Sequence, residues 1–121
     1  MSSEQPTRQT NITEWASATG NLRCARDRVG RTTVFRLCGE VDIATAPLLA
    51  TALEGDPGAE TTATVLDLAG VDFIDSAGIT VLVQADARAR DSHRHLTLTA
   101  VPAGIERTLS IAGVRSRVKV A

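Results

Sequence analysis

The apolar positions of the chain change their spacing several times, and each change predicts a new secondary-structure element. Residues 22–26 and 32–38 are short β-tolerant segments, and Gly30 supplies a turn between them. Residues 64–68 form an apolar, β-branched run with the size of an internal strand. We therefore expect an opening hairpin followed by a buried strand.

A three-and-four spacing of apolar residues predicts the first helix. Residues 39–42 are expected to break the second strand of the hairpin. Thr45 followed by Pro47 is then a helix-start signal, because threonine caps free amides and proline tolerates the first turn. Residues 55–58 should end this helix with a loop. Its buried face carries Leu48, Leu49, Ala52 and Leu53.

The same spacing returns over residues 76–90 and predicts an amphipathic helix that begins at Asp75 or Ser76. The next predicted elements are a strand at 96–101 and a helix that Pro102 opens. Gly113 should end that last helix. The sheet is then closed by Val118 and Val120.

Strands that alternate with helices predict one α/β domain, with a mixed, mainly parallel β-sheet and helices packed on it. A length of 121 residues suits a single hydrophobic core. Residues 1–20 are rich in polar side chains and have little periodic apolar pattern. We expect them to form a flexible N-terminal extension before a domain at residues 21–121.

The composition narrows the class of protein. With 43% hydrophobic and 22% charged residues, the chain should fold as a globular domain. A formal charge of −1 gives no reason to expect nucleic acid or an anionic membrane as a partner. No apolar run approaches the roughly 20 residues that span a bilayer, and the first ten residues do not resemble a signal peptide. We expect a cytoplasmic location.

The two cysteines do not predict a disulfide. A hairpin that turns near Val29 and Gly30 would place Cys24 opposite Phe35 instead of Cys38. We expect two buried free thiols.

The distinctive chemistry lies in residues 73–79, where the hydroxyl of Ser76 sits at the expected strand-to-helix junction. Helix amides without partners create a positive end there, which favours a phosphate group. A phosphate on Ser76 would add about −1.5 to −2 charges. Gly78 would let a partner's backbone or a nucleotide phosphate come close. Neighbouring carboxylates would add to the charge and repel a docked protein: Asp42, Asp72 and Asp75.

Plainer interpretations of these residues remain open. Ser76 is also a candidate helix cap, a role that is compatible with accepting phosphate. Thr80 is a rival acceptor one turn further on, although threonine inside a helix more often faces solvent or bonds back to the backbone. Asp42 and Asp75 are candidate caps of the first and second helices.

An enzymatic role is disfavoured. His93 and His95 have no third clustered ligand, so we expect no metal site. Ser76 lies outside any G-x-S-x-G elbow, and no histidine is clearly placed to serve it as a base. The P-loop pattern is absent as well. We expect neither catalysis nor a cofactor bound by this chain.

Two motifs make the chain resemble the STAS domain family and, within it, the bacterial anti-sigma factor antagonists. Residues 39–42 with 44–46 are similar to the family's segment between its second strand and first helix. Residues 75–78 are similar to its phosphoacceptor motif. The order and separation of the motifs also fit, and the resemblance extends from about Leu22 to Val120.

This resemblance implies a phosphorylation switch. In the family, an anti-sigma factor serine kinase uses ATP to phosphorylate the serine that matches Ser76, and a metal-dependent serine phosphatase restores it. ATP and magnesium would belong to the kinase. The unmodified antagonist binds the kinase and frees sigma factor, whereas the modified antagonist lets go. The aspartate that matches Asp42 faces the kinase, and the other implied contact residues are Thr45, Asp75, Ala77 and Gly78.

A second interpretation keeps the STAS domain but not the phosphorylation. The chain would then be a regulatory or structural subunit of a transporter or of a larger signalling assembly. A free-standing chain with no membrane segment argues mildly against this alternative.

Overall fold

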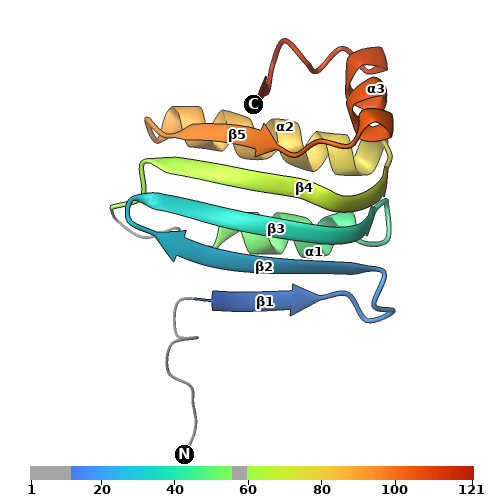
Figure 1. Ribbon diagram of the computed structural model, residues 1–121, viewed down its shortest axis with the longest axis horizontal. Coiled ribbons are helices and arrows are strands. Elements are labelled where there is room, and N and C mark those ends of the chain that lie inside the picture. Colours follow the sequence, from blue (N-terminus) through green and yellow to red (C-terminus); the bar gives the residue numbers. More distant parts are fainter. Residues whose placement is uncertain (1–11, 56–59) are drawn as a thin grey trace, which may run out of the picture.

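The strands lie in one sheet in the order in which they occur along the chain. The computed structural model describes residues 12–55 and 60–121 (Figure 1). The first three strands pair antiparallel and the last four pair parallel, so the expected mixed, mainly parallel sheet is confirmed. The described strands are β1 (Ile12–Ala16), β2 (Leu22–Val29), β3 (Thr32–Val41), β4 (Ala63–Ile74), β5 (His95–Thr99) and β6 (Lys119–Val120).

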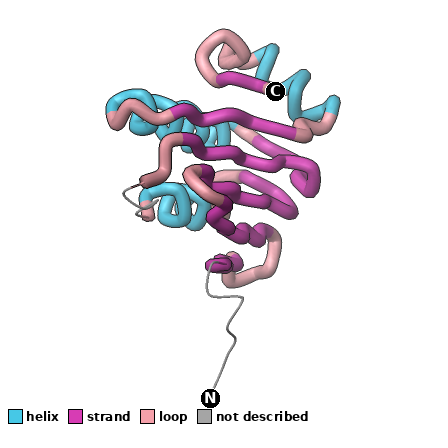
Figure 2. The backbone as a smooth tube through the Cα atoms, turned by 60° about the vertical axis from the view of Figure 1, so that its left-hand side comes forward, coloured by secondary structure: helices cyan, strands magenta, loops and turns pink. Residues whose placement is uncertain are grey.

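Each parallel connection contains a helix. The helices are α1 (Ala46–Glu54), α2 (Ser76–Asp91) and α3 (Ala103–Ile111). Helices α1 and α2 cover the same face of the sheet, and α3 lies at one end of it (Figures 1 and 2). The start of α2 and the opening of α3 after Pro102 agree with the sequence prediction. In the part of the chain that the structure describes, no helix is long and apolar enough to cross a membrane.

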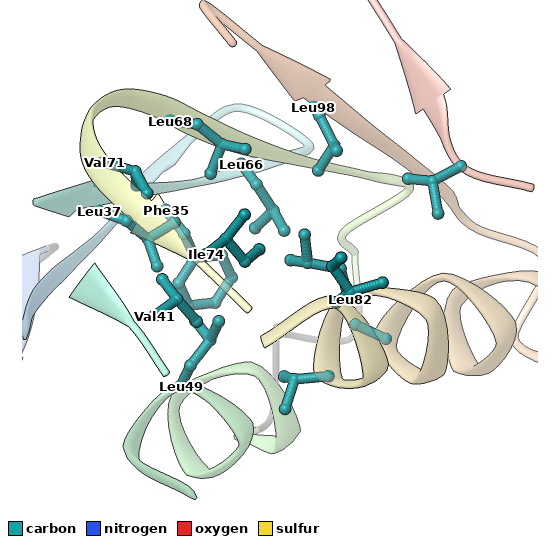
Figure 3. Packing of buried hydrophobic residues seen from close by; sticks show 14 of the residues in the cluster. Phe35, Leu37, Val41, Leu49, Leu66, Leu68, Val71, Ile74, Leu82 and Leu98 are labelled. Carbon is teal, nitrogen blue, oxygen red and sulfur yellow. The ribbon is translucent and has the colours of Figure 1, made fainter. Parts of the chain in front are cut away.

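The hydrophobic core lies between the sheet and its two covering helices (Figure 3). Val41 and Ile74, at the ends of β3 and β4, point into the same cluster. Close packing therefore fixes the strand ends from which the two sequence motifs continue. Leucines from both layers are almost completely buried: Leu49, Leu66, Leu82 and Leu98.

The hairpin turn is shorter than expected. Strand β2 ends at Val29 and β3 begins at Thr32, and Gly30 adopts a positive φ of 63° in the turn between them. This register places Cys24 opposite Leu37. The expected pairing of Cys24 with Phe35 is therefore wrong by two residues.

The two free cysteines differ in burial. Cys24 is buried, whereas Cys38 is exposed, so the expectation of two buried thiols is wrong for Cys38. Side chains alternate between the two faces of a strand, and Cys38 follows Leu37, which shares the face of Cys24. Burial raises the pKa of the Cys24 thiol to about 11, and the positive charge of Arg26, a smaller effect, acts in the opposite direction.

The polar N-terminal segment contributes an edge strand. We expected residues 1–20 to be a flexible extension, but Ile12–Ala16 pair antiparallel with β2. The guanidinium carbon of Arg26 lies 5.4 Å from the centre of the Trp15 ring and holds it against the domain. The expectation is therefore wrong for β1, and residues 1–11 lie outside the described part.

Strand β3 continues to Val41, so residues 39–42 do not break it as expected. Gly39 has a φ of 119°, and any Cβ at this position would overlap the carbonyl oxygen of Asn21. The glycine thus permits a close approach of two backbones inside the sheet. After α1, residues 56–58 of the expected loop lie outside the described residues.

Candidate functional site

The two sequence motifs meet at one end of the sheet, beyond the carboxyl ends of β3 and β4 (Figure 1). Val41 and Ile74 are partners in the parallel ladder. The amide of Asp75 donates a hydrogen bond of 3.1 Å to the carbonyl of Val41. Asp42 and Asp75 are the next residues after each strand, so the fold brings these distant segments side by side.

Ser76 is exposed and is the first residue of α2. The cap of this helix is Asp75, whose Oδ1 accepts from the amides of Ala77 at 2.9 Å and Gly78 at 3.2 Å. Because the carboxylate already satisfies these amides, the helix does not need the Ser76 hydroxyl as its cap. The capping role of Asp75 is confirmed, and the interpretation of Ser76 as the cap is wrong.

Removal of the Asp75 cap should lower the stability of the domain. We expect Asp75→Ala to lower the free energy of unfolding by about 1–2 kcal/mol, because two helix amides lose their acceptor. Urea unfolding followed by circular dichroism measures this change. The exposed Asp72 is the matched control, and Asp72→Ala should change stability by less than about 0.5 kcal/mol. Equal losses in the two variants would contradict the assigned cap.

Gly78 is buried beneath the end of β3. A Cβ at this position would lie 2.6 Å from Cγ1 of Val41, 2.8 Å from Cγ1 of Ile74 and 2.8 Å from the carbonyl oxygen of Val41. Its lack of a side chain therefore lets α2 pack against β3. This corrects the expectation that Gly78 admits a partner's backbone, since the close approach is internal to the domain.

Thr45 supports the loop before α1. It occupies the N-cap position, but its side chain makes no capping hydrogen bond. Its hydroxyl donates to the carbonyl of Glu40 at 2.7 Å and accepts from the amide of Asp42 at 2.9 Å. Thr45 is only 2% exposed. Thr45 therefore does not cap the helix with its side chain, and it is too buried to contact a partner directly. Its hydroxyl supports the loop from inside the domain.

Asp42 is half-buried in the same loop. Its Oδ1 accepts from the amides of Ala44 and Thr45, each at 3.0 Å. These amides precede α1, whose N-cap position is Thr45, so the interpretation of Asp42 as the cap of the first helix is wrong, and its carboxylate supports the loop instead. The loop between β3 and α1 is held in one conformation by these bonds.

The two remaining predicted residues, Ala77 and Thr80, differ in their exposure to solvent. Ala77 is partly buried and packs against the core. Thr80 is exposed, and its hydroxyl donates to the carbonyl of Ser76 at 2.8 Å. The side chain bonds back to its own helix, as expected for threonine inside a helix.

The segments next to Ser76 along the chain and in the sheet carry acidic and apolar side chains. Residues 37–87 contain nine Asp or Glu residues and no Lys, Arg or His. Ile43 is 80% exposed and Phe73 is 49% exposed in the segments that flank the site. The sequence prediction named neither as a site residue, and no local pattern marks either side chain as exposed. The acidic residues at this end are Glu40, Asp42, Asp72 and Asp75.

The histidines lie at the far end of α2. His93 and His95 follow the last residue of this 16-residue helix, and a rise of 1.5 Å per residue places that end roughly 24 Å from Ser76. Neither imidazole is within hydrogen-bond reach of the serine hydroxyl. Among the described residues, no group of three or more His, Cys, Asp or Glu side chains is arranged to hold a metal ion.

Comparison with known proteins identifies the family. A family model described as Mlab, STAS domain, matches residues 24–119. No curated protein matches the chain. The chain is similar to the crystal structure of an anti-sigma factor antagonist from Mycobacterium paratuberculosis, with 22% identity and a TM-score of 0.71. The match covers 86% of this chain and 88% of that protein.

Two further structures share the fold. The anti-sigma factor antagonist SpoIIAA in its unphosphorylated form has 18% identity and a TM-score of 0.64, over 81% of this chain and 87% of that one. The murine anion transporter Slc26a9 has 20% identity and a TM-score of 0.67, over 78% of this chain but only 16% of the transporter. The same fold therefore makes up most of SpoIIAA but only a small part of the transporter.

Proposed function

The chain belongs to the STAS domain family, and from this premise we propose that it is an anti-sigma factor antagonist whose phosphoacceptor is Ser76. The unmodified protein binds an anti-sigma factor serine kinase and releases sigma factor, and phosphorylation ends this binding. The observation that carries the proposal is the exposed hydroxyl at the start of α2, beside a carboxylate that already caps the helix. The similarity to anti-sigma factor antagonists supports it.

The phosphoryl transfer requires little chemistry from this chain. Oγ of Ser76 attacks the γ-phosphorus of ATP in the kinase, the bond to the β-phosphate oxygen breaks, and ADP leaves. The hydroxyl proton passes to a base of the kinase. This chain contributes an exposed nucleophile on a rigid helix start, and ATP and magnesium belong to the partner. The protein is thus a substrate and a binding partner, not an enzyme, and the switch operates in the cytoplasm, where ATP is available.

The new charge explains why phosphorylation ends binding. In the transfer complex Ser76 faces the nucleotide phosphates of the kinase, so a phosphoserine there faces the remaining phosphates of ADP. Like charges in one interface cost several kcal/mol. The amides of Ala77 and Gly78 already bind Asp75 and do not neutralise the added phosphate. A metal-dependent serine phosphatase reverses the switch by hydrolysing the exposed phosphoserine.

A phosphorylation assay tests the assignment. We expect the purified anti-sigma kinase with ATP and magnesium to add one phosphate to the wild-type protein and none to Ser76→Ala, because Ser76 supplies the only accepting oxygen. Intact-mass spectrometry counts the phosphates, and peptide mapping locates them. Thr80→Ala is the matched control and should accept one phosphate like the wild type. Phosphate on Ser76→Ala, or its loss from Thr80→Ala, would reassign the acceptor.

A second function is favoured by the match to the anion transporter. In this alternative the STAS domain is a regulatory or structural subunit of a transporter or of a larger signalling assembly, and Ser76 is not phosphorylated. The match to 16% of Slc26a9 shows that the fold also occurs within a transporter. Stable co-purification with transporter subunits, together with the absence of phosphate on Ser76 in cells, would favour this function.

A further inference from the structure

The sheet has an open face on the side away from α1 and α2. In the part of the chain that the structure describes, no helix lies on this side of β1, β2 and β3 (Figures 1 and 2). Cys24 and Leu37 are buried on the other, helix-covered side. Because side chains alternate along a strand, the neighbouring Arg23, Arg36 and Cys38 point to the open face, and all three are exposed.

A groove of about 570 Å³ lies over β1, β2 and β3 on the open face. Its lining includes two neighbouring rows of cross-strand partners, which are Ala16, Arg23 and Cys38, and Glu14, Ala25 and Arg36. The short side chains of Ala16, Ala25 and Cys38 leave a hollow between the longer ones. Small-molecule sites occupy roughly 300–1,000 Å³. The groove therefore has the size of a site for a small organic molecule.

Two guanidinium groups give the groove a cationic wall. Arg23 and Arg36 are diagonal neighbours in the β2–β3 ladder, so their Cα atoms lie roughly 7–8 Å apart and their side chains reach one ligand between them. Neither side chain makes a hydrogen bond or an ion pair with another described residue. Asp67, the ladder partner of Arg36, accepts instead from the amide of Ala69 at 2.9 Å. Both guanidinium groups are therefore available to an external ligand.

The chemistry of the lining defines the class of ligand. Guanidinium groups bind carboxylates, phosphates and similar oxyanions through paired, charge-assisted hydrogen bonds. Ala16 and Ala25 offer apolar contact on the floor of the groove. Glu14, on the β1 side, is the only carboxylate among the described residues that line the groove, and it repels a second anionic group at that side. A ligand that fits has one anionic group and an apolar body.

We propose that this groove binds a small organic anion, with its anionic group between Arg23 and Arg36 and its apolar body on Ala16 and Ala25. The site goes beyond the proposed function, because it lies on the face of the sheet opposite α2 and uses no residue of the Ser76 site. Ligand binding in the groove and phosphorylation of Ser76 are therefore two separate properties of the domain.

Cys38 provides a direct measure of occupancy. Its exposed thiol lines the groove opposite Arg23. Alkylation requires the thiolate, and Cys24 stays protonated because burial raises the pKa of its thiol to about 11. Iodoacetamide should therefore modify Cys38 and leave Cys24 intact. A ligand in the groove covers Cys38 and slows this reaction.

Fluorescence titration of the full-length chain with 8-anilinonaphthalene-1-sulfonate tests the proposal, because this probe joins one anionic group to an apolar body. We expect one saturable site per chain. Probe at about ten times its Kd should slow the alkylation of Cys38 about tenfold, since about one site in eleven then stays empty. Arg23→Gln and Arg36→Gln should each weaken probe binding by about tenfold, because each removes a charge-assisted contact. Ala25→Leu keeps both guanidinium groups but fills the floor, and it should weaken binding as much.

Arg107→Gln is the matched control, because it removes an exposed charge from α3. Its affinity for the probe should stay within about twofold of the wild type, as should that of Ser76→Ala. Equal weakening in Arg107→Gln, or loss of binding in Ser76→Ala, would overturn the site. Probe binding that leaves the alkylation of Cys38 unchanged or survives in Ala25→Leu would also overturn it. So would equal affinity for N-phenyl-1-naphthylamine, the same aromatic body without the sulfonate. Circular dichroism checks that every variant is folded.

Discussion

Gly78→Ala should destabilise the domain by about 2 kcal/mol or more, although alanine is the better helix former. The added methyl group meets two core side chains and the carbonyl oxygen of Val41. That carbonyl cannot move away freely, because it accepts the bond from the amide of Asp75. The strain therefore falls on the hydrogen bond between Asp75 and Val41. The cost of overpacking exceeds the gain in helix propensity.

Gly104 provides a matched control for this substitution. It also lies in the first turn of a helix, but a Cβ there would meet nothing within 4 Å. Gly104→Ala should therefore stabilise the protein by up to about 1 kcal/mol. Urea denaturation of the two variants and the wild type gives both values. Similar changes in the two variants would show that helix propensity, and not packing against β3, decides the effect.

A negative charge at Ser76 should weaken the kinase complex by about 100-fold, which corresponds to about 3 kcal/mol. Ser76→Asp introduces one charge and the phosphate nearly two, so the phosphorylated protein should bind more weakly still. The domain itself should remain folded, because an acidic residue is favourable in the first turn of a helix. The loss of affinity then reflects only the interface between this protein and the kinase.

Calorimetric titration of the nucleotide-bound kinase measures this loss. Ser76→Ala should bind like the wild type, and Thr80→Asp controls for a charge placed one turn further along α2. Raising the salt concentration should reduce the difference between Ser76→Asp and Ser76→Ala, because screening weakens like-charge repulsion. Equal affinities of these two variants at low salt would instead support the non-phosphorylated regulatory subunit.

The elements with strong periodicity were predictable from the sequence. The start of α2 followed from a polar pair before an amphipathic run, and the opening of α3 followed from Pro102. The neighbourhood of Asp42 and Asp75 also followed, because both residues come at the carboxyl ends of parallel strands. Local sequence patterns specify these features without knowledge of long-range contacts.

Other features depended on contacts that no local pattern reveals. Strand β1 is an edge strand with alternating exposure, and its polar residues resemble a loop. The position of the turn set the register of Cys24, and a turn shifted by one residue changes the opposing residue by two. The sequence suggested that Gly39 breaks a strand and that Gly78 admits a partner, but each glycine is required by another part of the domain that approaches it.

The sheet has the same strand order in space as in the chain, and this order has a consequence for synthesis on the ribosome. Each new strand finds its partner already made, because its neighbour precedes it in the sequence. No strand has to wait for a later one or be inserted between two others. The nascent chain is therefore able to assemble from β1 towards β6, and few strand edges are left open to other proteins while translation continues.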